Sequence, residues 1–156
     1  MWLVLFTIKG IRYGLNARDV LVVVADRECR PLPGAPSGVV GLMMHDGKPI
    51  PVIDVSEAIT GVPAERKLST RIVIVPYKPA GPDARIGLRL ARANDAARVE
   101  ASAFSEIGVS APDTPCLGPV ADLGGGWLVQ LVEVERLLTP AIRASLQPSS
   151  VPEVIA

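Results

Sequence analysis

Glycine and proline interrupt this chain so often that a long regular helix has little room to form. The 14 glycines and 15 prolines make up 29 of its 156 residues, and they lie between short apolar runs rather than in one linker. Because proline lacks a backbone N–H and glycine favours turns, this spacing predicts many short strands joined by tight turns. We therefore expect an all-β protein that contains short helices only.

Hydrophobic alternation and turn residues locate the expected strands. Residues 2–8 are apolar on both faces, which predicts a strand buried on both sides, and Lys9-Gly10 predicts a hairpin turn into residues 11–15. The other predicted strands cover residues 20–25, 39–44, 49–55, 71–76, 86–91, 93–99, 117–123 and 127–132. Helical segments are predicted over residues 56–59, 101–107 (ended by Gly108), 134–138 and 140–146.

A charged segment at residues 62–68 divides the chain near its middle. The strands on either side of it predict two small packed barrels rather than one sandwich. The approximate lobes are residues 1–67 and 68–138, between which terminal strands can be exchanged. We expect a single domain over residues 1–147 and a flexible tail over 148–156, where serine and proline are frequent.

Charge and cysteine content exclude several classes of function. The chain carries 16 Lys and Arg against 16 Asp and Glu, so it has no general basic field that would attract nucleic acid or anionic membranes. Its charge-free runs are far shorter than the roughly 20 residues of a membrane helix, so no direct membrane insertion is expected. Cys29 and Cys116 lie far apart without a CxxC motif, which predicts reduced thiols in an intracellular protein and no metal site; a single disulfide stays open as the alternative.

No combination of residues predicts catalysis. The only histidine, His45, precedes Asp46 in a predicted turn, where a solvated pair is expected and a catalytic dyad or a partner contact is the alternative. Asp54 and Glu57 flank a strand-to-helix junction, and their spacing is typical of a helix cap. Cys29 has an acid and a base as neighbours and is expected to be a structural thiol, while the few scattered aromatic residues are expected to fill cores. We expect neither an enzyme nor a bound cofactor.

An ordered series of motifs runs through the whole chain. The first half contains Val4-Leu-Phe-Thr-Ile8, Gly10, Tyr13-Gly-Leu15, Val20, Leu32-Pro-Gly-Ala-Pro36, Val40-Gly41, Gly47 and Ile50-Pro-Val-Ile-Asp-Val55. The second half adds Ile72 to Val75, Ile86-Gly-Leu88, Ala103-Phe104, Leu117-Gly118 and Trp127 to Leu138. This series resembles the CheW family of chemotaxis coupling proteins.

The resemblance implies a fold of two packed five-stranded SH3-like β-barrels with an apolar groove between them. It also implies a non-enzymatic adaptor that couples the cytoplasmic tip of a methyl-accepting chemoreceptor to the regulatory domain of a CheA-type histidine kinase. Such an adaptor is cytoplasmic and is held at the inner face of the membrane by receptor arrays. Exposed strand edges and apolar patches suit these contacts, because they offer backbone pairing and burial together.

Candidate partner-binding residues follow from the same resemblance. Val20 matches the family valine that faces the receptor tip, and Val39, Gly41 and Met43 lie on what is expected to be the adjoining strand. The presence of glycine at position 41 also has a physical reason, since glycine permits tight backbone geometry.

Two positions depart from the family pattern. The family commonly has an acid two residues after that valine and an arginine just before the motif's glycine, whereas this chain has Val22 and Asp46. The inverted charge predicts that the adaptor is insulated from the main chemotaxis array; the alternative is a CheW-like scaffold that has lost kinase coupling and binds a different protein partner. Residues 68–71 and 117–120 resemble CheW-like subunits of alternative chemosensory systems, especially the Wsp surface-sensing type, in which the kinase drives a diguanylate cyclase.

Overall fold

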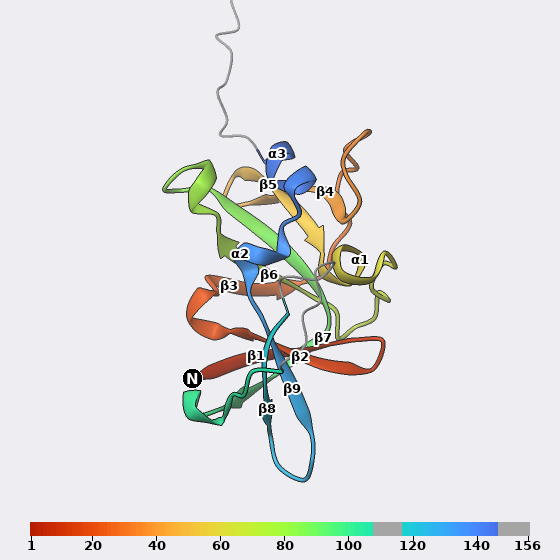
Figure 1. Cartoon of the computed structure of the whole chain (residues 1–156). Coiled ribbons are helices and arrows are strands. Elements are labelled where there is room, and N and C mark those ends of the chain that lie inside the picture. Colours follow the sequence, from red (N-terminus) through yellow and green to blue (C-terminus); the bar gives the residue numbers. More distant parts are fainter. Residues whose placement is uncertain (108–116, 147–156) are drawn as a thin grey trace, which may run out of the picture.

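The computed structural model describes residues 1–107 and 117–146 and shows a molecule built mainly of strands (Figure 1). The strands are β1 (Trp2–Ile8), β2 (Ile11–Asn16), β3 (Val22–Ala25), β4 (Val39–His45), β5 (Lys48–Asp54), β6 (Arg71–Pro76), β7 (Arg85–Arg98), β8 (Leu117–Asp122) and β9 (Leu128–Val132). The helices are α1 (Val55–Thr60), α2 (Val134–Leu137) and α3 (Pro140–Ser145), and 3-10 turns occupy η1 (Ala17–Asp19), η2 (Lys78–Ala80) and η3 (Ala101–Ala103). The expectation of a β-rich protein with short helices is therefore confirmed.

Two predicted elements differ from the observed ones. The strands expected over residues 86–91 and 93–99 are one long strand, β7, because its first half pairs with β6 and its second half continues along β1. The helical turn expected over residues 101–107 is limited to η3, and Ser105 instead forms a bridge with Val120. Gly108, the predicted end of that turn, lies outside the described residues.

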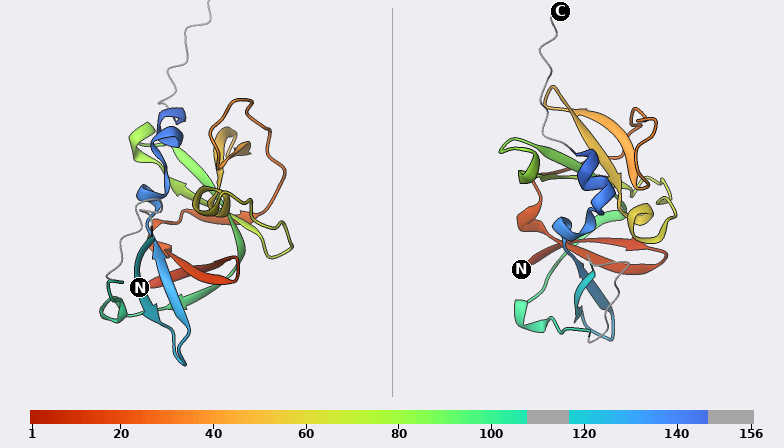
Figure 2. Two further views of the ribbon diagram at one scale, coloured as in Figure 1. Left: turned by 45° about the vertical axis from the view of Figure 1, so that its right-hand side comes forward. Right: turned by 45° about the horizontal axis from the view of Figure 1, so that its top comes forward.

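The long strand β7 connects two groups of strands. In the first group, called the β1 sheet, the order is β7-β1-β2-β9-β8; in the second, called the β6 sheet, it is β4-β5-β7-β6-β3. The pairs β2–β9 and β5–β7 are parallel, and the remaining pairs are antiparallel. The strands β1 and β2 pair with β7 and β9 rather than with β3 to β5, so strands from both sides of residue 67 share the β1 sheet, as the expected exchange of terminal strands allows. The further views show the two groups one above the other (Figure 2).

Strand alternation divides the buried side chains among three apolar clusters. In β1, Leu3 and Leu5 pack in the cluster of the β1 sheet, whereas Phe6 and Ile8 pack in a central cluster between the two sheets. In β6, Val73 also faces the central cluster, and its neighbours on the opposite face belong to a third cluster inside the β6 sheet. Because successive side chains of a strand point to opposite faces, β1 and β6 each form a wall between two cores. The predicted burial on both sides of this strand is confirmed for residues 3–8, whereas Trp2 is exposed.

Local turn and cap chemistry agrees with the sequence. The turn residues Lys9 and Gly10 have φ values of 49° and 76°, and the pair Asp46 and Gly47 has the same values, as expected for tight two-residue hairpin turns. Asp54 is the N-cap of α1, and its carboxylate accepts hydrogen bonds from the backbone N–H groups of Glu57 and Ala64, both at 3.0 Å. The predicted cap at this junction is confirmed.

The two tryptophans do not fill cores, which corrects the expectation for the aromatic residues. Trp2 is 57% exposed and Trp127 is 66% exposed, whereas Phe6 and Tyr13 are buried and stack with ring centroids 5.8 Å apart. Trp127 lies in the turn between β8 and β9, where the guanidinium carbon of Arg12 is 5.7 Å from its ring centroid. This cation–π contact covers part of a ring that the core does not enclose.

In the residues that the structure describes, no helix is both long and apolar enough to cross a membrane.

Candidate protein-interaction surface

The described part of the chain offers little material for a reactive centre. Across residues 1–107 and 117–146, no group of three or more His, Cys, Asp and Glu side chains lies close enough to hold a metal ion. The His45 imidazole Nε2 lies 3.5 Å from the Asp46 carboxylate, which is exposed in its turn. A side-chain pair of this kind at a hairpin tip is a surface contact.

The segment Leu21, Val22 and Val23 presents apolar side chains to solvent at the edge of the β6 sheet. Their exposed fractions are 50%, 37% and 40%, and within the described residues β3 has only β6 as a strand partner. We call these three residues the β3 edge surface. An edge strand of this kind offers free backbone groups beside apolar side chains, which is the combination that a partner strand or helix can bury.

The residues before β3 explain why this segment lies at the edge. The Asn16 side chain accepts a hydrogen bond from Arg18 N–H at 3.0 Å and begins the 3-10 turn η1, which redirects the chain after β2. Val20 ends this turn, and its half-buried side chain packs against the central cluster. Leu21 N–H then donates to the Ile74 carbonyl at 2.8 Å, which starts the pairing of this segment with β6. Val20 thus anchors the chain, and the next three residues are left exposed.

An ionic network that runs from the buried Arg89 to the exposed Glu28 holds the chain that follows β3. The Asp26 carboxylate accepts hydrogen bonds from Arg89 Nε at 2.9 Å and from Arg66 Nε at 2.8 Å, and Arg66 Nη1 also contacts Glu28 Oε1 at 2.6 Å. The Arg89 side chain is only 6% exposed, and its Nη2 donates to the Arg27 carbonyl at 3.0 Å. Burial would raise the pKa of Asp26, but the two arginines outweigh it and hold this pKa below its ordinary value. The network therefore ties the chain leaving β3 to β7.

Cys29 lies beside this network as a half-buried free thiol. Its sulfur accepts a hydrogen bond from Arg89 Nη2 at 3.6 Å, and burial raises the pKa of the thiol above its ordinary value despite the nearby guanidinium. A raised pKa leaves little reactive thiolate, which agrees with the structural role expected from sequence. Cys116 lies outside the described residues, so the alternative of a disulfide stays open.

The candidate residues on β4 do not share one surface with Val20 and Val22. Val39 packs against the central cluster, and Met43 is 4% exposed inside the β6 sheet. Gly41 is buried with φ of 150°, and a Cβ atom placed there would lie 2.0 Å from the Arg30 carbonyl oxygen. The strand expected to adjoin β3 instead pairs with β5, and it meets the chain after β3 through the bridge between Arg30 and Leu42 and through a hydrogen bond from Arg27 Nη1 to the Met44 carbonyl at 3.5 Å. A role for these three residues in partner binding stays a prediction, and a packing role is visible for each.

Asp46 lies at the tip of the β4–β5 hairpin, and its carboxylate is 3.5 Å from Arg85 Nη1 at the start of β7. The charge that departs from the family pattern is therefore paired within the chain. Because both side chains are exposed, this pair is expected to contribute little to stability, and both groups stay accessible to a partner.

Sequence reasoning missed Leu21 and Val23 of the β3 edge surface and the ionic network behind it. The pattern of apolar residues over 20–25 indicated a strand but could not say which side chains the fold would leave exposed. Arg89 did carry a signal, because it stands between Leu88 and Leu90 in residues 86–91, which are otherwise apolar. A lone cation in such a run needs a buried acid, although only the fold shows that this acid is Asp26.

Comparison with known proteins gives a family and a fold. A family model described as CheW-like domain matches residues 3–141. Among solved structures, the chain is similar to the scaffolding protein TtCheW from Thermoanaerobacter tengcongensis, with a TM-score of 0.77 and 22% sequence identity over 90% of this chain and 89% of that one. Among curated proteins no match was found.

Proposed function

We propose, from the premise that this chain belongs to the CheW-like domain family, that it couples a methyl-accepting chemoreceptor to a CheA-type histidine kinase. Members of this family are scaffolding proteins of chemotaxis signalling and not enzymes. The partners are the receptor's cytoplasmic tip and the kinase's regulatory domain. The protein would then act in the cytoplasm, at the inner face of the membrane where receptors are held.

The β3 edge surface is the observation that carries this proposal. It joins three exposed apolar side chains to an edge strand, while Val20 and the Asp26–Arg89 pair hold the chain on either side of it. A surface held at both ends loses little conformational entropy on binding, so more of the burial energy becomes affinity. We assign the receptor tip to this surface.

The finer description of the fold as two five-stranded SH3-like barrels belongs to the same proposal. Each sheet contains five strands when β7 is counted in both. The bridge between Arg30 and Leu42 joins the chain after β3 to β4, and that between Ser105 and Val120 joins the chain after β7 to β8. These bridges link the two ends of each five-stranded order, which is what closure into a barrel requires.

The output pathway is the least constrained part of the proposal. The residues at 68–71 and 117–120 favour an alternative chemosensory system of the Wsp type, in which the kinase drives a diguanylate cyclase. A second candidate function is a scaffold that has lost kinase coupling and binds another protein, and the acidic Asp46 in place of a cation favours it. The two candidates differ in whether any kinase binds.

The experiment is a titration of the purified protein against the regulatory domains of every CheA-type kinase encoded in the same genome, with receptor-tip fragments in parallel. Selective binding to one kinase and one receptor tip is the expected result. Binding to a receptor tip without any kinase would replace the coupling role with the second candidate. Binding to neither would overturn both.

A further inference from the structure

Strand β7 carries a bulge at the point where it passes from one sheet to the other. Along β1 the pairing advances by two residues, from Leu5 to Thr7, while along β7 it advances by four, from Asp95 to Ala91. Arg92 begins the extra stretch with a φ of 52°, which is an unfavourable conformation for a residue with a side chain. Such strained bulges often mark places where a fold re-aims side chains for binding.

Within the bulge, one side chain points into the core and its two neighbours point to solvent. Ala93 is buried in the central cluster, and its N–H donates to the Ser69 carbonyl at 3.0 Å. Arg92 and Asn94 on either side of it are exposed. The backbone strain at Arg92 is thus held by core packing, and its result is an arginine directed to the surface between the two sheets.

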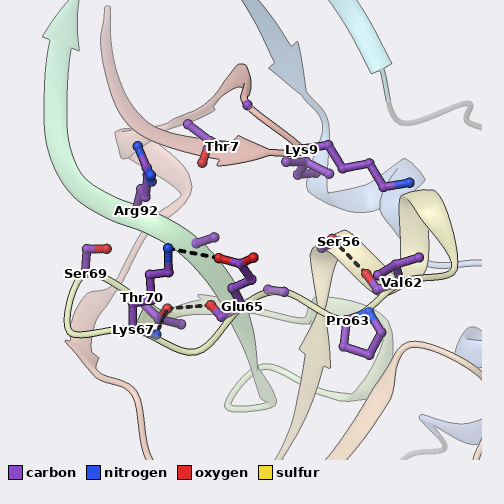
Figure 3. A pocket seen from close by; sticks show the side chains of 14 residues that line it. Thr7, Lys9, Ser56, Val62, Pro63, Glu65, Lys67, Ser69, Thr70 and Arg92 are labelled. Atoms are coloured by element: carbon purple, nitrogen blue, oxygen red, sulfur yellow. Dashed lines mark hydrogen bonds and ion pairs between the residues drawn. The ribbon is translucent and has the colours of Figure 1, made fainter.

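Two adjoining hollows lie at this place, and we call them together the junction groove. The first, with a volume of about 290 Å³, lies among the β1–β2 turn, the loop before β6 and the bulge of β7 (Figure 3). The second, of about 370 Å³, extends the first along β7. They share Thr7, Lys67, Ser69 and Arg92.

The junction groove is positively charged although the whole chain is neutral. Lys9, Arg12, Lys67 and Arg92 line it, against the two acids Glu65 and Asp95. The ammonium of Lys67 binds the Glu65 carboxylate at 3.0 Å. This contact with Lys67, with a smaller effect from Arg92, holds the pKa of Glu65 below its ordinary value. Two positive charges remain after the acids are subtracted.

Hydroxyl groups complete the polar lining. In the described part of the chain, the side chains of Thr7 and Ser69 make no hydrogen bond, and both are half-buried beside Arg92 and Lys67. Figure 3 shows Arg92 and Ser69 near each other at one side of the first hollow and Thr7 above them, while Lys9 lies at the far side, above Ser56 and Val62. Free hydroxyls beside cations are the groups that bind carboxylate oxygens.

We infer that the junction groove binds closely spaced carboxylates of an acidic segment in a protein partner. The choice of a protein segment as the source of the anion rests on the proposed scaffolding role, and the groove's length, which spans two hollows, favours an extended segment over a single ion. The site differs from the β3 edge surface, whose residues are apolar and lie on another strand.

The test is fluorescence anisotropy with a labelled hexaglutamate peptide at low ionic strength. The full-length protein is expected to bind this probe, and Lys9→Gln/Arg92→Gln is expected to weaken binding at least about tenfold. The matched control is Lys48→Gln/Lys78→Gln, which removes the same two charges from exposed lysines outside the groove and is expected to change the affinity less than about twofold. Circular dichroism confirms that each variant is folded.

Three outcomes would overturn the inference. No binding of hexaglutamate to the wild-type protein would remove the site. An equal loss of affinity in the groove variant and in the control would show that the peptide is held by general charge attraction and not by the groove. If pyrophosphate displaced the labelled peptide at the same concentration as unlabelled hexaglutamate does, the groove would be a site for a small anion and not for an acidic segment. Each of these leaves kinase and receptor binding untouched, so the proposed function is judged separately by its own titration.

Discussion

Asp26 is the residue whose charge matters most to the surface behind β3, because it bridges a buried and a half-exposed arginine. We predict that Asp26→Asn lowers the free energy of unfolding by about 3 kcal/mol at neutral pH, since it leaves the Arg89 guanidinium buried without a counter-charge. Arg66→Gln removes the more exposed partner and should cost about 1 kcal/mol or less. Urea denaturation of the three proteins measures the difference, and equal losses in the two variants would contradict this ranking.

The same carboxylate predicts a dependence of stability on pH. Because the pKa of Asp26 is lower in the folded than in the unfolded chain, the unfolded chain takes up the proton first as the pH falls. The stabilisation is complete at neutral pH and decreases below about pH 4. Wild-type protein should therefore lose more stability between pH 7 and pH 3 than Asp26→Asn does. An equal loss of stability between pH 7 and pH 3 in the two proteins would show that other carboxylates cause the effect.

Asp46 is predicted to determine which kinase binds. Since its carboxylate lies beside Arg85, Asp46→Arg alone would bring two guanidinium groups together, so the informative variant is Asp46→Arg/Arg85→Glu, which reverses the pair. We expect the double variant to bind the CheA-type kinase of a general chemotaxis array about fivefold more tightly than wild type, or ~1 kcal/mol. Isothermal titration measures this, with Arg85→Glu alone as control. Unchanged affinity would end the argument that Asp46 insulates the adaptor.

At the scale of elements, two nearby positions at the edge of β3 have different roles: Val20 packs against the core, and Val23 is exposed for binding. Val23→Asp places a charge on an exposed side chain, so we expect a folded protein whose affinity for the receptor tip falls at least about tenfold. Val20→Asp places the charge against the central cluster and should lower stability by about 2 kcal/mol in addition. Thermal unfolding and receptor-tip binding of both variants separate the effects. Full receptor affinity in Val23→Asp would remove the β3 edge surface from the proposal.

Strand β4 depends on a close backbone contact at Gly41. A Cβ atom at this position would overlap the Arg30 carbonyl, which belongs to the bridge that joins β4 to the chain after β3. We predict that Gly41→Ala costs about 3 kcal/mol or more, because backbone atoms must move. Gly47→Ala is the matched control: its φ is also positive, but its Cβ would meet nothing within 4 Å, so a cost of about 1 kcal/mol is expected from strain alone. Similar losses would show that the positive φ, not the contact, requires glycine at position 41.

At the scale of the whole molecule, the shared strand β7 and the central cluster predict cooperative unfolding. The fragment 1–67 contains β1 to β5 but lacks β7 and β9, the partners of β1 and β2. We therefore expect this fragment to be unfolded by circular dichroism, and the full chain to unfold in one transition seen alike by circular dichroism and tryptophan fluorescence. A folded fragment would establish residues 1–67 as an independent lobe.

Most strand positions and local turns could be predicted, whereas the grouping of the strands could not. The pairs Lys9-Gly10 and Asp46-Gly47 and the cap at Asp54 depend on residues close in sequence, so their chemistry is visible locally. The charged segment near residue 67 indicates an exposed loop, but it could not show that β1 and β2 pair with β7 and β9.

The candidate site shows the same limit. The segment around Val20 and Val22 was identified through a resemblance, yet Met43 was expected on a binding surface and is buried. Alternation states that neighbouring side chains face opposite sides, but it does not say which side is interior: Met43 is buried, whereas Met44 beside it is 56% exposed. The exposed members, Leu21 and Val23, follow from the position of β3 at an edge.

By itself the sequence determined the β-rich class, the hairpins, the first helix cap and the family, because these depend on short-range patterns and on the order of motifs. Only the tertiary structure decided that Asp26 meets Arg89, 63 residues away, and that Lys9, Lys67 and Arg92 line one groove. Contacts of this kind depend on strand register and on the path of β7 through both sheets. A local sequence pattern cannot predict the register or the path of β7, since the free energy that selects them comes from burying three cores together.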